Sequence, residues 1–217
     1  MADEEQKDSI EHWTAILIAI VTVIAAVVAW RASVAADGAG DEDYDGLKAV
    51  VNVQEVTTVA TVEAYQHAQA YANFRRYAEI SNTLDEELAE ASGSQAKDLE
   101  QRQAEADAMV DSKLQMFPNK FMDREGRYKA DAEVGELVAA ASRTRDLAPK
   151  PHFDQAEVLR TKAERLLMGV VFLSLGLVCL TLVESLEGGG RTGLLLLGVI
   201  LGIGGTVFSV LVEVGKL

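Results

Sequence analysis

The amino-acid sequence predicts an all-α membrane protein: three transmembrane helices with a helical-hairpin soluble domain between spans one and two. Apolar residues make up 49% of the chain, and they gather into three long runs without a charged side chain. A run of about 20 apolar residues is what a helix needs to cross the hydrocarbon core of a bilayer. Between the first two runs, apolar residues recur at the three- and four-residue spacing of an amphipathic helix.

Residues 1–12 form an acidic N-terminal tail, and residues 13–31 form transmembrane helix 1. The run from Trp13 to Trp30 holds 18 residues, which span roughly 27 Å at about 1.5 Å per residue. Tryptophan at both ends is typical of the aromatic belts at the two membrane interfaces. The tail is acidic where a cleaved signal peptide carries positive charge, so an uncleaved anchor is predicted.

Residues 166–184 form transmembrane helix 2 and residues 192–213 form transmembrane helix 3. A glycine-rich turn at 185–191 joins them, and residues 214–217 are a C-terminal tail. The turn is too short to hold a domain, so the two spans are predicted to form an antiparallel hairpin.

Lysine and arginine residues near the span ends predict the orientation. Two lie on the side of the N-terminus, Lys7 and Arg191, and five lie on the side of the soluble domain: Arg31, Arg160, Lys162, Arg165 and Lys216. The bias predicts a multi-pass protein of the plasma (inner) membrane, with its soluble domain in the cytoplasm and its N-terminus outside.

Small side chains mark the faces where spans are expected to touch. They recur at alternating four- and three-residue spacing in two of the runs: Ala15, Ala19, Thr22 and Ala26 in the first, and Gly198, Gly202, Gly205 and Ser209 in the third. Small residues let helix backbones approach closely in lipid. The spacing predicts helix packing, either within one chain or between chains.

The segment 32–46 is predicted to be an acidic linker. Within it, Asp41, Asp43 and Asp45 followed by Gly46 match the first half of an EF-hand calcium loop. The match then fails, because Asn52 stands where the loop needs a bidentate glutamate. The alternative interpretation is a solvated acidic linker with no bound calcium.

Residues 47–165 are predicted to form the helical soluble domain. No proline or glycine interrupts residues 47–91, which favours one long helix. Glycine and proline then divide the remainder into a second helix, a loop, a short third helix and a helix continuous with span two, at 94–115, 117–129, 131–145 and from about 154. Such a hairpin has little core of its own and is expected to pack against further copies or a partner.

Two clusters in the soluble domain are candidate sites. The first is a partner surface in which arginines flank aromatic residues: Tyr71, Phe74, Arg75, Arg76 and Tyr77. The competing interpretation places these aromatic rings in the core of the hairpin. The second cluster is Glu63 and His67, four residues apart on one helix face, which can act as paired metal ligands or form a surface hydrogen bond.

Charge and motifs limit the function classes. The formal net charge is −14, from 20 basic and 34 acidic residues, so no nucleic-acid partner is expected. No span carries an internal charge, and no phosphate-binding or nucleophile motif is present, so the chain is predicted not to be an enzyme. The prediction is a membrane-anchored scaffold or accessory subunit that assembles as a homo-oligomer or with a partner membrane protein. The alternatives are a homo-oligomeric pore component and a calcium- or ligand-sensing membrane module.

The plan of the chain resembles an uncharacterised family of small bacterial three-span membrane proteins. The resemblance is carried by WTAILIAIVTVIAAVVA near the start and by AYQHAQA at 64–70, which is similar to a Tyr-Gln-Ala motif of that family. It implies one N-terminal span, a helical hairpin and two C-terminal spans, and it implies no activity. The acidic segment and the insert at 117–151 depart from the family pattern.

Overall fold

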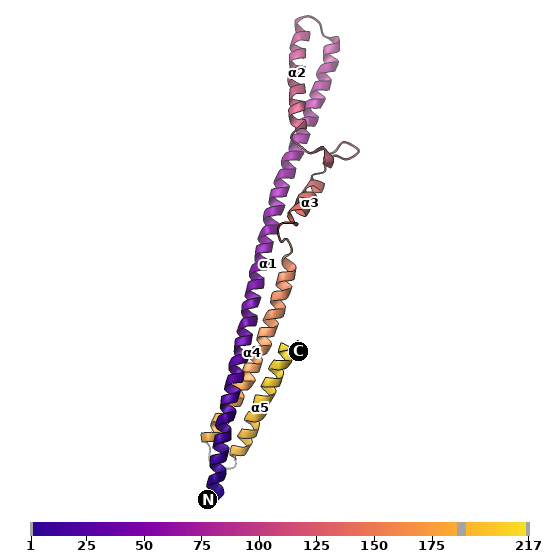
Figure 1. Ribbon diagram of the computed structural model, residues 1–217. Helices are drawn as coiled ribbons and strands as arrows, with labels where there is room; N and C mark the ends of the chain where they lie inside the picture. The colour runs from indigo at the N-terminus through magenta and orange to yellow at the C-terminus, as the bar shows by residue number, and fades with distance from the viewer. Residues whose placement is uncertain (1, 186–189, 216–217) are drawn as a thin grey trace. The chain divides into compact units, whose positions relative to one another are not determined.

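The structure is a computed structural model that describes residues 2–185 and 190–215, and those ranges are helical apart from short connections. The all-α prediction is confirmed. Figure 1 shows the elements in chain order: α1 (Ala2–Glu90), α2 (Ser94–Leu114), the 3-10 turn η1 (Asn119–Phe121), α3 (Ala130–Ala141), α4 (Pro149–Ser185) and α5 (Gly190–Glu213).

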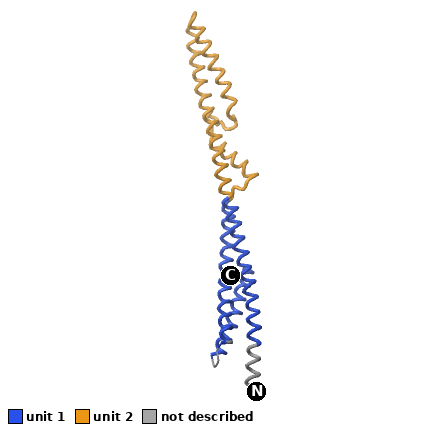
Figure 2. Tube along the Cα trace, turned by 90° about the vertical axis from the view of Figure 1, so that its left-hand side faces the viewer, with its two compact units in different colours: residues 1–47, 149–217 blue, residues 48–148 orange. Residues whose placement is uncertain are grey.

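The chain divides into two compact units, which are coloured separately in Figure 2. Unit 1 holds residues 1–47 and 149–217, and unit 2 holds residues 48–148. Helix α1 contributes its first part to unit 1 and its remainder to unit 2. All three apolar runs therefore belong to unit 1.

Three helices are long and apolar enough to cross a membrane: α1 from His12 onward, Pro149–Val183 of α4, and α5. They contain the three predicted spans and indicate an integral membrane protein. Trp13 and Trp30, at the two ends of the first run, are 63% and 61% exposed, as interfacial tryptophans would be. Most of the predicted turn, residues 186–189, lies outside the described residues, as do residues 216 and 217.

Unit 1 is held together by an apolar core that all three helices share. Its buried members recur every seven residues on α4 and stand seven and four residues apart on α1, spacings typical of helices packed at a shallow angle. They are Val21, Val28 and Ala32 of α1, Leu166, Leu173 and Leu180 of α4, and Val212 of α5. At one end of the bundle, Glu213 of α5 pairs with both Arg31 of α1 and Lys162 of α4.

The segment 32–46 is part of α1, so the prediction of a linker is wrong. Each glycine in a helix costs about 1 kcal/mol relative to alanine, which is why the sequence of this segment predicts an interruption of the helix. Packing against α4 offsets this cost. A Cβ on Gly46 would lie 2.8 Å from the Phe153 ring, so that ring rests on bare helix backbone. Ala35 and Ala39, on the same side of α1, are 7% and 3% exposed.

Acidic side chains of this segment also have partners on α4. The Glu42 carboxylate lies 2.8 Å from Nδ1 of His152, and Nη2 of Arg160 donates to Asp43 over 2.5 Å. Those partners stand 110 and 117 positions further along the chain. The acidic residues therefore belong to an interface between α1 and α4.

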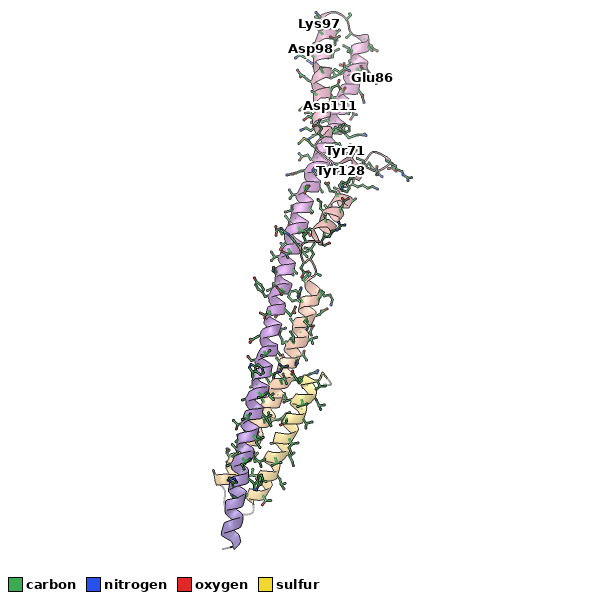
Figure 3. All side chains as sticks on the ribbon, viewed as in Figure 1. Tyr71, Glu86, Lys97, Asp98, Asp111 and Tyr128 are labelled. Atoms are coloured by element: carbon green, nitrogen blue, oxygen red, sulfur yellow. The ribbon has the colours of Figure 1, made fainter. Side chains whose placement is uncertain are left out.

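Unit 2 begins with an antiparallel hairpin of α1 and α2. Gly93, with φ of 67°, makes the turn between them, a conformation that favours glycine. Leu99 and Ala106 of α2 are buried against α1, and Ser81 donates to Asp107 over 2.6 Å. The outward faces are charged, as the labelled residues of Figure 3 illustrate: Glu86, Lys97, Asp98 and Asp111.

Helix α3 packs against the part of α1 that lies in unit 2. Arg145 pairs with Glu55 at 2.9 Å, and Asn52 donates to the backbone carbonyl of Asp146 over 3.2 Å. The helix ends at Ala141, four residues before the predicted end, and the proline-containing stretch that follows leads into α4. Helix α4 begins at Pro149 and continues into span two without a break, as predicted.

Candidate functional site

An aromatic cluster joins α1 to the loop that precedes α3. Tyr71 and Phe74 come from α1, and Phe117, Phe121 and Tyr128 come from the loop and η1. The rings of Tyr71 and Phe117 meet edge to face with centroids 5.4 Å apart, and Tyr71 stacks on Tyr128 at 5.8 Å. Pairs of this geometry contribute about 0.5–1.5 kcal/mol each beyond area burial. The cluster fixes the loop on α1.

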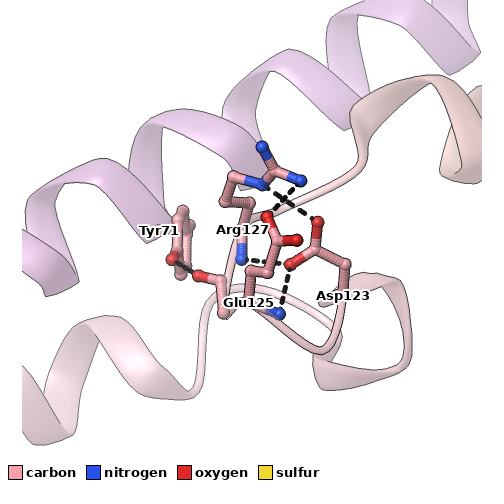
Figure 4. A network of polar contacts seen from close by, with 5 residues as sticks. Tyr71, Asp123, Glu125 and Arg127 are labelled. Carbon is pink, nitrogen blue, oxygen red and sulfur yellow. Dashed lines mark hydrogen bonds and ion pairs between the residues drawn. The ribbon is translucent and has the colours of Figure 1, made fainter.

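Asp123 organises the loop between η1 and α3, as Figure 4 shows. One carboxylate oxygen, Oδ1, accepts from the backbone N–H groups of Glu125 and Arg127 at 2.9 and 2.8 Å. The other, Oδ2, accepts from Nε of Arg127 at 3.1 Å. Hydrogen bonding from the Arg127 backbone N–H lowers the pKa of Asp123 most, and the Arg127 side chain lowers it further.

The same loop is fastened to α1 through the glycine at its tip. Gly126 has φ of 71°, a conformation that favours glycine, and its carbonyl accepts the hydroxyl proton of Tyr71. A single bridge pairs Met122 with Tyr128 and closes the loop. Tyr128 is thereby held pointing toward the first turn of α3.

Glu133 in that first turn is a buried acid, only 2% exposed. Both of its carboxylate oxygens have partners. Oε1 lies 2.6 Å from Nδ1 of His67 on α1, and Oε2 accepts from the Tyr128 hydroxyl at 2.5 Å. A buried carboxylate is stable only when it is paired and hydrogen-bonded in this way.

Glu63 lies near His67 and Glu133, and the three residues form a group of potential metal ligands. One ligand atom each from Glu63, His67 and Glu133 can be chosen so that all lie within 4.8 Å of one another, and this is the one such metal-ligand group among the described residues. Burial raises the pKa of the Tyr128 hydroxyl, and the nearby carboxylates of Glu133 and Glu63 raise it further. Tyr128 therefore stays protonated and acts as a donor to Glu133.

An open groove between α1 and α3 runs past this group. It has a volume of about 250 Å³ and is lined by Glu55, Val56, Val59, Ala60, Glu63, Leu137, Ala141 and Arg145. Glu63 therefore belongs both to the donor group and to a solvent-open surface. Two carboxylates, an imidazole and a phenol make the group suitable for binding a cation.

The two predicted small-residue faces lie in different surroundings. Gly198, Gly202, Gly205 and Ser209 are buried in α5. A Cβ on Gly205 would lie 3.1 Å from Leu173 of α4, and one on Gly202 would lie 3.3 Å from Val21 of α1. This face therefore packs within the chain.

Among the described residues, the small-residue face of α1 is left exposed. Ala15, Ala19, Thr22 and Ala26 are all exposed, whereas Val21 and Val28, on another side of the same helix, are buried in the core of unit 1. The bundle thus packs against a different side of α1 from the one that the small residues form.

The three aspartates predicted as calcium ligands do not form an EF-hand loop. Asp41, Asp43 and Asp45 lie in α1, where residues two positions apart point to nearly opposite sides of the helix. Asp43 is paired with Arg160, and Asp41 and Asp45 are exposed. An EF-hand site needs these oxygens to converge around a turn, and a helix cannot provide that geometry.

The predicted partner surface divides into two parts. Tyr71 and Phe74 belong to the aromatic cluster, Tyr77 is half-buried, and Arg75 and Arg76 are exposed.

Glu133 and Tyr128 are site residues that the sequence did not reveal. The spacing of Glu63 and His67 was a signal, but Glu133 stands 66 residues beyond His67 and is brought near by the fold.

No protein-family model, no curated protein and no solved structure matches the chain.

Proposed function

We propose that the protein is a non-catalytic, membrane-anchored scaffold that assembles with a second copy of itself through α1. The observation that carries the proposal is the exposed face of α1 in unit 1. Its small residues continue at the same alternating spacing through Ala29, which is half-buried, and then beyond the predicted span through Ser33, Ala36 and Gly40, which are exposed. A face of this kind extends over seven turns of helix, counting about 3.6 residues per turn.

The physics of lipid favours another helix on this face. Burial of apolar area drives little association inside a bilayer, so helices associate where small side chains allow close backbone contact. Large apolar residues on the neighbouring side of α1, such as Val23 and Val27, are 64% and 52% exposed and suit contact with lipid chains. The small face suits contact with a helix instead.

A second copy is the partner that the pattern supports. A twofold interface brings the same face of both protomers together, so it must be complementary to itself. Within the predicted span this face consists of alanine and threonine and carries no charge, which meets that condition; on its continuation, Asp37 lies between Ser33 and Gly40 and is exposed. Where the face reaches the end of unit 1, Tyr44 and Leu47 are exposed at 69% and 58%, which adds apolar area to the same side.

Orientation is part of the proposal. The excess of lysine and arginine beside the soluble domain supports a cytoplasmic soluble domain and an external N-terminus. In that orientation, the scaffold would present the acidic hairpin of α1 and α2 to cytoplasmic partners.

Cysteine crosslinking in native membranes tests the assembly. Cys179, the single native cysteine, is first replaced by serine. Ala19→Cys and Ala26→Cys, on the small face, should form covalent dimers on mild oxidation, whereas Val27→Cys, which is also exposed but lies on the neighbouring side, should not. Equal crosslinking at all three positions would indicate random collision and would refute the interface.

The mass of the assembly separates the remaining outcomes. Native mass spectrometry in a mild detergent should give an integer multiple of 23.4 kDa. A complex with other polypeptides, together with no dimer from either cysteine variant, would replace self-assembly with an accessory-subunit role.

A second candidate function is ligand sensing, and one observation favours it. Glu63, His67 and Glu133 bring three potential cation ligands together from two helices of unit 2. Binding there would alter how α3 is held on α1.

A further inference from the structure

The donor group of unit 2 combines two residues of one helix with a third from a separate element. Glu63 and His67 lie on the same face of α1, four residues apart, and Glu133 lies in the first turn of α3. Their ligand atoms converge within 4.8 Å. Two ligands of one tetrahedral zinc ion lie about 3.4 Å apart, given bonds of about 2.1 Å. In unit 2, Nδ1 of His67 lies 2.6 Å from Oε1 of Glu133, and the ligand atoms of the group all lie within 4.8 Å of one another. The zinc value of about 3.4 Å falls between these two distances.

A second histidine–carboxylate pair in the chain can be compared with the donor group of unit 2. His152 and Glu42 also form a histidine–carboxylate pair, with Nδ1 and Oε2 2.8 Å apart. No third ligand joins them in a metal-binding group within the described ranges, whereas Glu63 joins His67 and Glu133. A hydrogen bond between histidine and glutamate is therefore a general feature of this protein, and convergence of three ligands distinguishes the group in unit 2.

We propose that Glu63, His67 and Glu133 bind a divalent transition-metal ion of the zinc type. Imidazole nitrogen suits zinc and its first-row neighbours, and calcium prefers a set of oxygens alone. Three protein ligands leave a fourth position open, and the groove beside Glu63 gives that position access to solvent. The inference deepens the ligand-sensing candidate and does not depend on self-assembly, so the crosslinking and metal experiments can fail separately.

Tyr128 orients the buried ligand. Its hydroxyl occupies Oε2 of Glu133 and leaves Oε1 directed toward His67. Partners that hold a ligand in this way commonly change metal affinity by about 10- to 100-fold when removed. The bound ion would add a link between α1 and α3 to those made by the Arg145–Glu55 pair and by the aromatic cluster of the preceding loop.

The test is a titration of the full-length protein in detergent micelles, without a histidine tag and after removal of metal by a chelator. Calorimetry with Zn²⁺ should show one equivalent bound, and Co²⁺ should give the visible absorption of a tetrahedral site. Ca²⁺ should give no comparable heat. His67→Ala and Glu63→Gln should each lower Zn²⁺ affinity by at least about tenfold.

Matched variants keep the result interpretable. His152→Ala removes the other paired histidine and should leave Zn²⁺ affinity unchanged. Glu63→Gln leaves the His67–Glu133 hydrogen bond in place, so it tests the metal even if variants of the buried Glu133 fail to fold. Equal Zn²⁺ binding by His67→Ala, Glu63→Gln and the parent protein would mean adventitious binding to surface acids and would overturn the proposal, as would no saturable Zn²⁺ binding.

Discussion

Replacing Gly176 with alanine tests a close approach of the α4 and α5 backbones in unit 1. A Cβ at this position would lie 3.1 Å from the carbonyl oxygen of Gly198 and 3.2 Å from the backbone nitrogen of Gly202. Both are backbone atoms of α5, which cannot rotate away as a side chain can. Helices α4 and α5 must therefore separate by a few tenths of an ångström to admit the methyl group.

The expected loss follows from the neighbours of Gly176. Leu173 and Leu180 lie within about one turn of it on α4 and are 0% exposed, so a small separation loosens their contacts. Overpacking of this kind costs about 1–3 kcal/mol. The gain from replacing a helical glycine is small here, because membrane helices persist in both the associated and the dissociated state. We expect a net loss of about 1–2 kcal/mol.

Unfolding of the purified protein by increasing SDS in a mild detergent measures this loss through near-ultraviolet circular dichroism. Gly204→Ala is the matched control, because a Cβ on Gly204 would meet nothing within 4 Å. The control should change the free energy of unfolding by no more than about 0.5 kcal/mol. Equal unfolding midpoints for Gly176→Ala and Gly204→Ala would refute the close contact between α4 and α5.

Two further predictions concern the loop of unit 2. Tyr71→Phe keeps the ring in the aromatic cluster but removes the hydrogen bond to the Gly126 carbonyl, so thermal unfolding should show that the free energy of unfolding falls by about 0.5–1.5 kcal/mol. The control is Tyr65→Phe, at a residue 73% exposed, which should show no loss. Equal effects of the two substitutions would contradict the Tyr71–Gly126 contact. Because the pKa of Asp123 is lowered in the folded state, its contribution should be full above the unfolded pKa of about 3.9 and should disappear as the pH falls through the folded pKa. An NMR titration midpoint for Asp123 at or above the ordinary value would contradict this, and Asp123→Asn should abolish that part of the acid dependence.

The spans could be predicted from sequence because their cause is local. A long run without charge crosses a bilayer whatever surrounds it, since each backbone group is satisfied within the helix. The burial of Gly198, Gly202 and Gly205 on one face of α5 followed from spacing for the same reason. The turn at Gly93 and the loop containing Pro118 and Gly126 likewise depend on local backbone preferences.

The helical state of residues 32–46 could not be predicted, because the stabilising groups lie elsewhere in the chain. Local propensity disfavours a helix containing Gly38, Gly40 and Gly46. Phe153 and Arg160 of α4, more than 100 residues away, supply the packing and the ion pair that overcome this preference. The calcium prediction failed for the same reason, since it assumed that the segment was free to turn.

The sequence by itself determined that three helices are long and apolar enough to span a membrane, and it determined the periodic faces of small residues, because hydrophobicity and helical period are properties of contiguous residues. Tertiary structure alone decided which face packs inside the chain and which remains exposed. It also decided that Glu133 would meet His67 and Glu63, because a donor group drawn from α1 and α3 exists only once the intervening loop is anchored by Tyr71 and Asp123. Contacts between residues so distant in sequence cannot be predicted from a local sequence pattern.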